Sequence, residues 1–232
     1  MTGSWTEYKD AELQARALAK MVAGQLGLAL AERGWATLAL PGGSTPERFL
    51  RILSKAAIDW AKISVLLTDE RFVPESSTRS NTRLLRENLF QGPAASARLV
   101  PMYLPAAEPE QVLNALRDGL RPALPLDVCV LGMGTDRHIA SLFPGADLLD
   151  AALDPDGAEI LLPMRAPGAP EPRLTLTAAV LRRARHLHLL IQGTEKRAAL
   201  EAAEQGGPAH LAPVRIVLDA PAPLNIHYTK AG

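Results

Sequence analysis

Short, nearly all-apolar segments alternate along this chain with longer segments in which apolar residues recur at helical spacing. We expect strands at residues 35–40, 63–68, 126–131 and 187–192, and helices at residues 9–33, 45–54, 81–89, 108–120 and 194–203. Strands that are apolar on both faces and separated by amphipathic helices are typical of a parallel sheet covered by helices on both sides. No repeat or low-complexity linker interrupts the pattern. The sequence therefore predicts one three-layer α/β domain over residues 1–232.

Charge and composition exclude several classes of protein. The chain has 25 basic and 25 acidic residues, so it carries no broad positive surface for nucleic acid or an anionic membrane. Its apolar stretches are far shorter than a bilayer span, and the acidic residues Glu7, Asp10 and Glu12 do not fit a signal peptide. One cysteine, Cys129, excludes an intramolecular disulfide framework. We expect a cytoplasmic protein without nucleic-acid or membrane partners, and the oligomeric state stays open, a monomer included.

The first predicted strand ends in a glycine-rich loop, Pro41-Gly42-Gly43-Ser44-Thr45-Pro46. Gly42 and Gly43 allow the backbone to approach a ligand closely, and Ser44 and Thr45 add hydroxyl donors. The N-terminus of the following helix offers free N–H groups, and proline suits its first position. This pattern fits a phosphate-binding loop. The alternative is a tight turn with Thr45 as helix cap and nothing bound.

The second predicted strand ends in Thr68-Asp69-Glu70-Arg71-Phe72-Val73-Pro74. Three consecutive charged residues are compatible with a solvated turn. In an extended chain, however, Asp69 and Arg71 point the same way, so both side chains would face one cleft. Downstream, Ser80-Asn81 is either a helix cap or a source of an amide for the same cleft.

The third predicted strand runs into Gly132-Met133-Gly134-Thr135-Asp136-Arg137-His138, a turn with an aspartate and a histidine. Open α/β sheets place their chemistry at such strand ends, and a histidine such as His138 can serve as a general base. The alternatives are a histidine that caps a helix over 139–142, and a serine hydrolase using Ser141, which lacks the expected Gly-x-Ser-x-Gly elbow. Cys129 lies within the strand and is expected to be a core residue.

Two cations later in the chain are further candidates. Arg173 precedes a predicted helix, and Lys196, which follows a strand, is the only lysine between residues 62 and 230. Each is either an ordinary surface cation or a ligand for the anion held by the first loop. His186 and His188 alternate on one face of a strand, but no third ligand stands at a telling spacing. We therefore favour an interpretation without metal.

Together these segments resemble the 6-phosphogluconolactonase family, in the family's order and over most of the chain. The matching segments are Leu40–Pro46, Thr68–Pro74, Ser80-Asn81, Gly132–Gly145, Arg173–Thr177 and Gly193–Lys196. The resemblance implies a Rossmann-like, mostly parallel α/β fold of the sugar-phosphate isomerase type. It also implies hydrolysis of 6-phospho-D-glucono-1,5-lactone in the oxidative pentose phosphate pathway, with neither a metal nor an organic cofactor.

The resemblance further implies roles for individual residues. His138 would activate water for attack on the lactone carbonyl, and Asp69 would help to hold the histidine or the sugar hydroxyls. The remaining residues would hold the phosphate or line the pocket: Gly42, Gly43, Ser44, Thr45, Arg71, Asn81, Arg173 and Lys196. Tight phosphate binding remote from the reacting carbon would position that carbon.

Arg137 departs from the family pattern, which has glycine between the aspartate and the histidine. If this position needs a positive φ, arginine costs roughly 1–2 kcal/mol and shifts His138. Its side chain would otherwise point outward and leave the turn intact, or enter the cleft as an extra cation.

Two other functions remain as alternatives. Glucosamine-6-phosphate deaminase/isomerase shares the sheet and the phosphate loop, but its segment after the histidine resembles Phe-Asn-Glu-Pro-Gly. Here the stretch is Ser141-Leu142-Phe143-Pro144-Gly145, which has no glutamate. A non-catalytic sugar-phosphate binding module is favoured only by Arg137, and no helix-turn-helix accompanies the domain.

Overall fold

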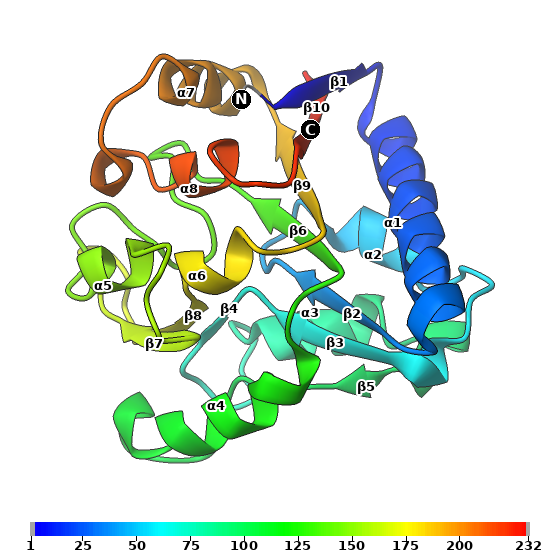
Figure 1. Cartoon of the computed structure of the whole chain (residues 1–232), viewed down its shortest axis with the longest axis horizontal. Helices are drawn as coiled ribbons and strands as arrows, with labels where there is room; N and C mark the ends of the chain where they lie inside the picture. Colours follow the sequence, from blue (N-terminus) through cyan, green and yellow to red (C-terminus); the bar gives the residue numbers. More distant parts are fainter. Residues whose placement is uncertain (1–2, 231–232) are drawn as a thin grey trace.

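A seven-stranded parallel sheet forms the centre of the computed structural model, which describes residues 3–230 (Figure 1). Its strands stand in the order β1 (Ser4–Tyr8), β10 (Leu224–Thr229), β9 (His186–Gln192), β6 (Val128–Gly132), β2 (Ala36–Leu40), β3 (Ile63–Leu67) and β5 (Arg98–Leu99). Every neighbouring pair is parallel. This confirms the mostly parallel sheet, and the four predicted strands form its middle. Cys129 is fully buried within β6, as expected for a core residue.

Helices cover both faces of this sheet. The helices are α1 (Ala11–Arg33), α2 (Glu47–Leu53), α3 (Asn81–Asn88), α4 (Leu113–Leu120), α5 (Leu149–Leu153), α6 (Ala178–Leu181), α7 (Thr194–Glu204) and α8 (Arg215–Leu218). Short 3-10 turns occupy Trp60–Lys62, Gly92–Ser96, Pro109–Gln111, Arg121–Ala123 and Ala209–Leu211. In Figure 1, α1 and α2 lie on one side of β2, β6 and β9, and α6, α7 and α8 lie on the other. The predicted three layers are therefore present.

The longest helix, α1, shows how the local sequence sets its ends. The Asp10 side chain accepts a hydrogen bond of 2.8 Å from the Leu13 N–H, which caps the first turn. Gly34 ends the helix in the left-handed conformation, with φ of 78°. Between these signals Leu18, Val22 and Leu26 are fully buried, and their spacing of four residues places them on one face toward the sheet.

A second, three-stranded sheet was not expected from the sequence. Its strands are antiparallel and stand in the order β4 (Asp69–Arg71), β8 (Arg173–Leu176) and β7 (Leu161–Met164). The charged segment after the strand at 63–68 is thus a strand, not a solvated turn. The strands of this sheet are short, and β4 pairs with β8 across about 100 residues of chain, for which the local pattern carries no signal.

Several predicted helix boundaries were wrong. The helix expected at 108–120 is a 3-10 turn over Pro109–Gln111 followed by α4, because Val112 between them has the non-helical ψ of 0°. The helix expected at 45–54 begins only at Glu47. Pro46 occupies the capping position without a side-chain bond, so Thr45 is not the cap. No helix forms at 139–142, where isolated bridges define a tight turn instead.

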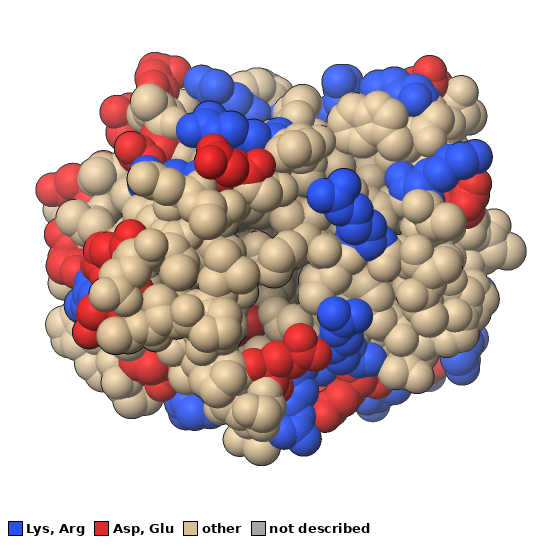
Figure 2. Space-filling model, turned by 90° about the horizontal axis from the view of Figure 1, so that it is seen from below, with Lys and Arg blue, Asp and Glu red and all other residues tan. Residues whose placement is uncertain are grey.

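Surface charge and helix length add two observations. Figure 2 shows a face that is hollowed near its centre, with basic and acidic side chains interspersed and no continuous patch of one sign. Among the helices described within residues 3–230, none combines the length and apolarity that crossing a membrane requires.

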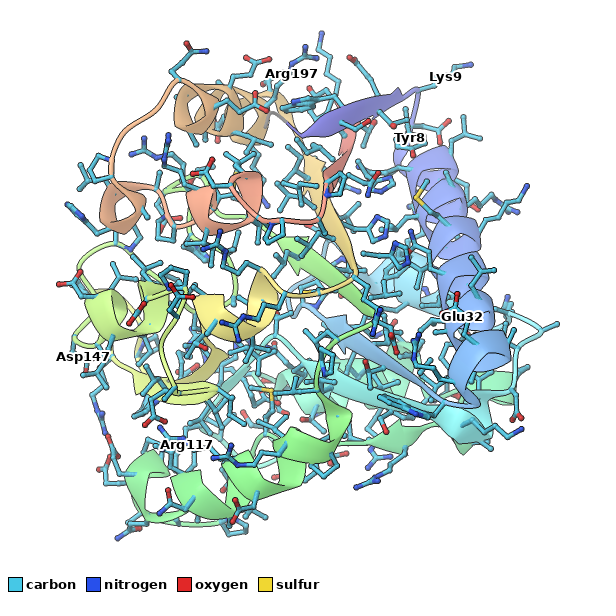
Figure 3. All side chains as sticks on the ribbon, in the orientation of Figure 1. Tyr8, Lys9, Glu32, Arg117, Asp147 and Arg197 are labelled. Atoms are coloured by element: carbon cyan, nitrogen blue, oxygen red, sulfur yellow. The ribbon has the colours of Figure 1, made fainter. Side chains whose placement is uncertain are left out.

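A chain of buried polar side chains links α1 to the sheet. The Tyr8 hydroxyl, near the start of α1 (Figure 3), lies 2.9 Å from Nδ1 of His227. Nε2 of His227 lies 3.1 Å from Nδ1 of His188, and Nε2 of His188 lies 2.8 Å from Oε1 of Gln25. Burial lowers the pKa of His188 to about 3, aided by the neighbouring His227 and His186. Burial also lowers the pKa of His227 to about 4, so both rings are neutral at pH 7.

These two histidines make the fold sensitive to acid. Their native pKa values lie below the value of about 6.5 expected in the unfolded chain, so only the unfolded chain takes up protons as the pH falls. The stabilisation is complete above pH 6.5 and is lost on the way down toward pH 3. Between pH 7 and pH 5 we expect each histidine to lower the free energy of unfolding by about 2 kcal/mol.

Urea unfolding at pH 7, 6 and 5 measures this loss. His188→Gln removes one titrating ring and should reduce the pH dependence by about half. The exposed His210 provides a control, because His210→Gln should leave the dependence unchanged. Equal pH dependence in the wild type and His188→Gln would contradict the assignment.

Candidate active site

A cavity of about 370 Å³ lies at the carboxyl ends of β2 and β6, where open parallel sheets bind their ligands. Its walls come from the glycine-rich loop, β4, the turn after β6, β8 and the first turn of α7. The lining residues are Pro41, Gly42, Gly43, Ser44, Thr45, Pro46, Asp69, Arg71, Asn81, Gly132, Met133, Gly134, His138, Ala140, Phe143, Arg173, Leu190 and Lys196. Every residue that the sequence singled out for catalysis or phosphate binding is in this list.

Two arginines face each other across the second sheet. Arg71 on β4 stands opposite Arg173 on β8 in the antiparallel register, and like charges at such positions repel. Arg173 is only 8% exposed. Its pKa is lowered, first by burial and then by Arg71. The Nε atoms of both arginines are buried and have no hydrogen-bond partner in the described part of the chain. An anion between the two guanidinium groups would reduce their mutual repulsion and would accept hydrogen bonds from their unpartnered N–H groups.

A third cation approaches the same cavity from α7. Lys196 lies in the first turn of this helix, and burial lowers the pKa of its amine. Within residues 3–230 it has no ion pair that would offset the burial. The helix begins after Gly193, whose φ is 90°, and its free N–H groups add positive potential at the same end. Arg197 stacks on Trp5 and Tyr228 and holds the helix against β1 and β10 (Figure 3).

The two glycines of the glycine-rich loop are needed for different reasons. Gly43 has a φ of 87°, and a Cβ there would meet no atom within 4 Å, so its backbone is open to a ligand. A Cβ on Gly42 would stand 2.1 Å from the Asn81 side chain, so Gly42 makes room for this amide. Asn81 donates to the Asp69 carbonyl at 2.9 Å, while its buried Oδ1 has no partner among the described residues.

Glu70 fixes the cavity wall from behind, although the sequence did not single it out. Its fully buried carboxylate accepts backbone hydrogen bonds from Arg71, Asn81 and Thr82 at 2.7–2.8 Å. Ser80 caps α3 and also donates to Glu70 at 3.2 Å. Burial raises the pKa of Glu70, and the hydrogen bonds from Asn81 and Thr82 oppose that rise. The sequence carried one signal for this role. Glu70 stands between Asp69 and Arg71, and in a strand its side chain must face the side opposite to theirs.

The histidine pairs with an aspartate from its own turn. Nδ1 of His138 lies 2.6 Å from Oδ1 of Asp136, and within residues 3–230 no hydrogen bond engages Nε2. The Phe143 ring packs against the imidazole, with centroids 4.3 Å apart. It also lies 5.7 Å from the Arg173 guanidinium. The histidine is therefore held by one nitrogen, with the other left for chemistry.

Asp69 does not hold the histidine, which corrects one of the two roles expected for it. Its carboxylate accepts a hydrogen bond of 2.5 Å from the Ser141 hydroxyl and one of 3.3 Å from Thr68. Ser141 is fully buried and bound to this carboxylate, so it is not a nucleophile. The suggestion that His138 caps a helix was also wrong, because the residues after it form a turn. Asp136 and Ser141 were thus missing from the expected site.

Comparison with known proteins identifies the family. Residues 9–224 match the model of the glucosamine-6-phosphate isomerases/6-phosphogluconolactonase family. The chain belongs to this family. It is 45% identical to a 6-phosphogluconolactonase of Rhizobium meliloti, over 98% of this chain and 99% of that one. It is 49% identical to a 6-phosphogluconolactonase of Pseudomonas aeruginosa, over 93% of this chain and 90% of that one. The crystal structure of a 6-phosphogluconolactonase from Shewanella baltica superimposes with a TM-score of 0.92 at 30% identity, covering 98% and 97% of the two chains.

Arg137, which stands where the family pattern has glycine, has a left-handed backbone conformation. Its φ is 70°, as a glycine at this place would allow. The turn is nevertheless intact: Gly134 donates to the His138 carbonyl, and Arg137 N–H donates to the Gly134 carbonyl, both at 3.0 Å. The Arg137 carbonyl accepts from Val214 at 3.0 Å, which ties the turn to the segment before α8. The arginine side chain does not line the cavity, so it adds no cation to the site.

A metal site finds no support in these residues. Among residues 3–230, no three His, Cys, Asp or Glu side chains are arranged to hold a metal ion. His186 and His188 do not form one, since His188 bonds to His227 and Gln25 instead.

Replacing Arg137 by glycine should stabilise the protein. Relief of the left-handed conformation contributes roughly 1–2 kcal/mol, and the greater freedom of glycine in the unfolded chain takes back about 0.4–1 kcal/mol. We expect the free energy of unfolding in urea at pH 7 to rise by about 0.5–1 kcal/mol. Arg137→Ala is the matched control, because it removes the guanidinium but keeps the strained Cβ. An equal gain in Arg137→Ala would show that the backbone conformation is not the cause.

Proposed function

We propose that this chain hydrolyses 6-phospho-D-glucono-1,5-lactone to 6-phospho-D-gluconate. The observation that carries the proposal is the combination, in one cavity, of a histidine held by an aspartate with three cations that the described carboxylates neutralise at most weakly. His138, paired with Asp136, stands on one wall, and Arg71, Arg173 and Lys196 stand on others. A substrate that suits both must carry an anion at one end and an electrophilic carbon at the other. The names and close similarity of the curated relatives supply the specific lactone.

The phosphate group would bind between the glycine-rich loop and the three cations. Gly43 offers its open backbone, Ser44 and Thr45 offer hydroxyl groups, and Arg173 and Lys196 bring positive charge that the cavity leaves uncompensated. Charge-assisted hydrogen bonds of this kind are roughly twice as strong as neutral ones. Holding the phosphate fixes the distance to the lactone carbon, and such positioning contributes several orders of magnitude to the rate.

Lactone opening would use the free nitrogen of His138. Nε2 takes a proton from a water molecule as its oxygen attacks the carbonyl carbon, and Asp136 on Nδ1 stabilises the imidazolium that forms. As the bond between that carbon and the ring oxygen breaks, the same proton passes to the ring oxygen. The products are the acid and a free hydroxyl. Asp69, held by Ser141, is placed to accept hydrogen bonds from sugar hydroxyls, with Arg71 and Asn81 beside it.

The two alternatives lose support at particular residues. A deaminase would need an acid where Phe143 stands, and here that side chain packs on the imidazole ring. A binding module without turnover rested on Arg137, yet the turn around Arg137 keeps His138 bonded to Asp136. We also propose a cytoplasmic location, in keeping with Cys129, which is a buried free thiol.

Removing the proposed base should abolish most of the activity. His138→Ala is expected to lower kcat for lactone hydrolysis by about 10²–10⁴-fold, the usual contribution of general-base catalysis. Because His138 is partly exposed, the circular dichroism and melting temperature should change little. His210→Ala, at an exposed position outside the cavity, serves as control. Full activity in His138→Ala, measured against the spontaneous hydrolysis rate, would show that the base is wrongly assigned.

Displacing the His138 ring without removing it should also lower the rate of hydrolysis. A Cβ at Gly134 would lie 2.4 Å from the His138 ring, so Gly134→Ala must displace the imidazole. We expect kcat to fall at least tenfold while the affinity for 6-phosphogluconate, which depends on the phosphate, changes less than threefold. Gly24→Ala is the control, since a Cβ there meets no atom within 4 Å. Unchanged kcat in Gly134→Ala would mean that the position of the ring is not critical.

A further inference from the structure

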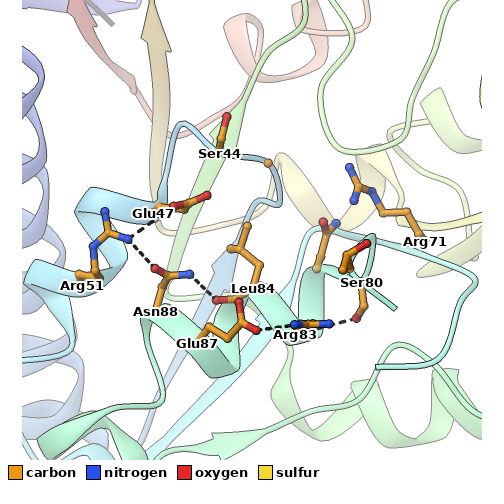
Figure 4. A pocket seen from close by; sticks show the side chains of 12 residues that line it. Ser44, Glu47, Arg51, Arg71, Ser80, Arg83, Leu84, Glu87 and Asn88 are labelled. Carbon is orange, nitrogen blue, oxygen red and sulfur yellow. Dashed lines mark hydrogen bonds and ion pairs between the residues drawn. The ribbon is translucent and has the colours of Figure 1, made fainter. Parts of the chain in front are cut away.

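A second cavity, of about 510 Å³, adjoins the proposed phosphate site, and His138 does not line it (Figure 4). It lies between α2 and α3. Gly43, Ser44, Arg71 and Asn81 line both this cavity and the first one. The proposed phosphate site is therefore a boundary between two cavities and not the closed end of one. The volume is within the range of roughly 300–1,000 Å³ that is typical of small-molecule sites.

Charges in the second cavity neutralise one another. Arg51 donates to Glu47 at 3.4 Å and to Asn88 at 2.8 Å. Arg83 donates to Glu87 at 2.7 Å. Figure 4 shows these pairs along the two helices.

Apart from Arg71 at the boundary with the first cavity, the rest of the wall is uncharged and mostly polar. It includes Thr78, Ser80 and the single apolar side chain Leu84. Since Arg51 and Arg83 are already matched by carboxylates, and Arg71 belongs to the proposed phosphate site at the boundary, the wall between α2 and α3 suits an uncharged, hydroxylated group better than a second anion.

We propose that the enzyme accepts phosphodiesters: lactones whose phosphate carries a second, hydroxylated substituent such as glycerol, which occupies the second cavity. This inference rests on the proposed lactone hydrolysis. The phosphate of a diester keeps one negative charge, which Arg71, Arg173 and Lys196 still attract. The reaction is the same as for the monoester. Water adds to the carbonyl carbon, the bond to the ring oxygen breaks, a proton passes to that oxygen, and the phosphodiester stays intact.

Calorimetry with stable product analogues provides the first test. The wild-type chain is titrated with 6-phosphogluconate and with its glycerol phosphodiester, and each corresponding lactone is assayed for hydrolysis. We expect the diester to bind within about tenfold of the monoester and its lactone to be hydrolysed. A site closed behind the phosphate would bind the monoester only, which would overturn the inference while leaving the proposed function intact.

A matched pair of variants tests where the substituent lies. Thr78 lines the second cavity, and Ser76, two residues earlier in the same exposed loop, lines neither cavity. Thr78→Trp should raise the ratio of diester to monoester dissociation constants at least tenfold, and Ser76→Trp should leave it unchanged. An unchanged ratio in Thr78→Trp would place the substituent elsewhere and overturn the inference.

The two proposals fail in different ways. If the wild type hydrolyses neither lactone but binds both acids, and Thr78→Trp selectively weakens the diester, the second cavity stands and the lactonase proposal falls. If neither acid binds, both proposals fall.

Discussion

The pairing of β4 with β8 is the interaction on which the site depends. β4 continues from β3 after a single residue, so the carboxyl end of the large sheet leads directly into the small one. The antiparallel register then sets Arg71 against Arg173 and Asp69 against Thr175. Alternation along both strands turns these four side chains toward one face, two of them repelling cations. The fold holds this unfavourable pair in place because the strands are anchored elsewhere.

The anchoring comes from buried polar contacts that never reach the cavity. Glu70, between Asp69 and Arg71, faces the other way and accepts hydrogen bonds from the start of α3. A carboxylate satisfied in this way is stable when buried, whereas the same group without donors would be costly. Gly42 lets Asn81 approach the loop. Glu70, which lines neither cavity, thus helps to determine where Arg71 and Asn81, which line both, stand.

The proposed chemistry follows from which polar groups of the site have hydrogen-bond partners and which have none. His138 has Asp136, and Asp69 has Ser141 and Thr68, so both groups are oriented before a substrate arrives. Nε of Arg71 and of Arg173 and Oδ1 of Asn81 remain without partners in the described residues. The site thus combines an oriented base with arginine N–H groups that have no partner. A ligand that carries both a phosphate and a reactive carbonyl would gain most from such a site.

Hydrophobic spacing is a local property, and it was enough to predict the middle strands of the sheet, the long helices and the polar loops at the strand ends. The order of the loops along the chain also indicated the family. Only the tertiary structure decided which aspartate holds His138, because the buried Ser141 hydroxyl, 72 residues away in the chain, engages Asp69 and leaves Asp136 as the partner of the ring. Arg137 has a left-handed backbone, and Asp136 before it bonds to the ring of His138 after it. The pairing of β8 with β4 brings Arg173 next to Arg71, which is about 100 residues away in the chain. The Arg71–Arg173 contact depends on chain closure over a long distance, which no local pattern encodes, whereas the Asp136–His138 pair lies within one turn and depends on the backbone conformation of that turn.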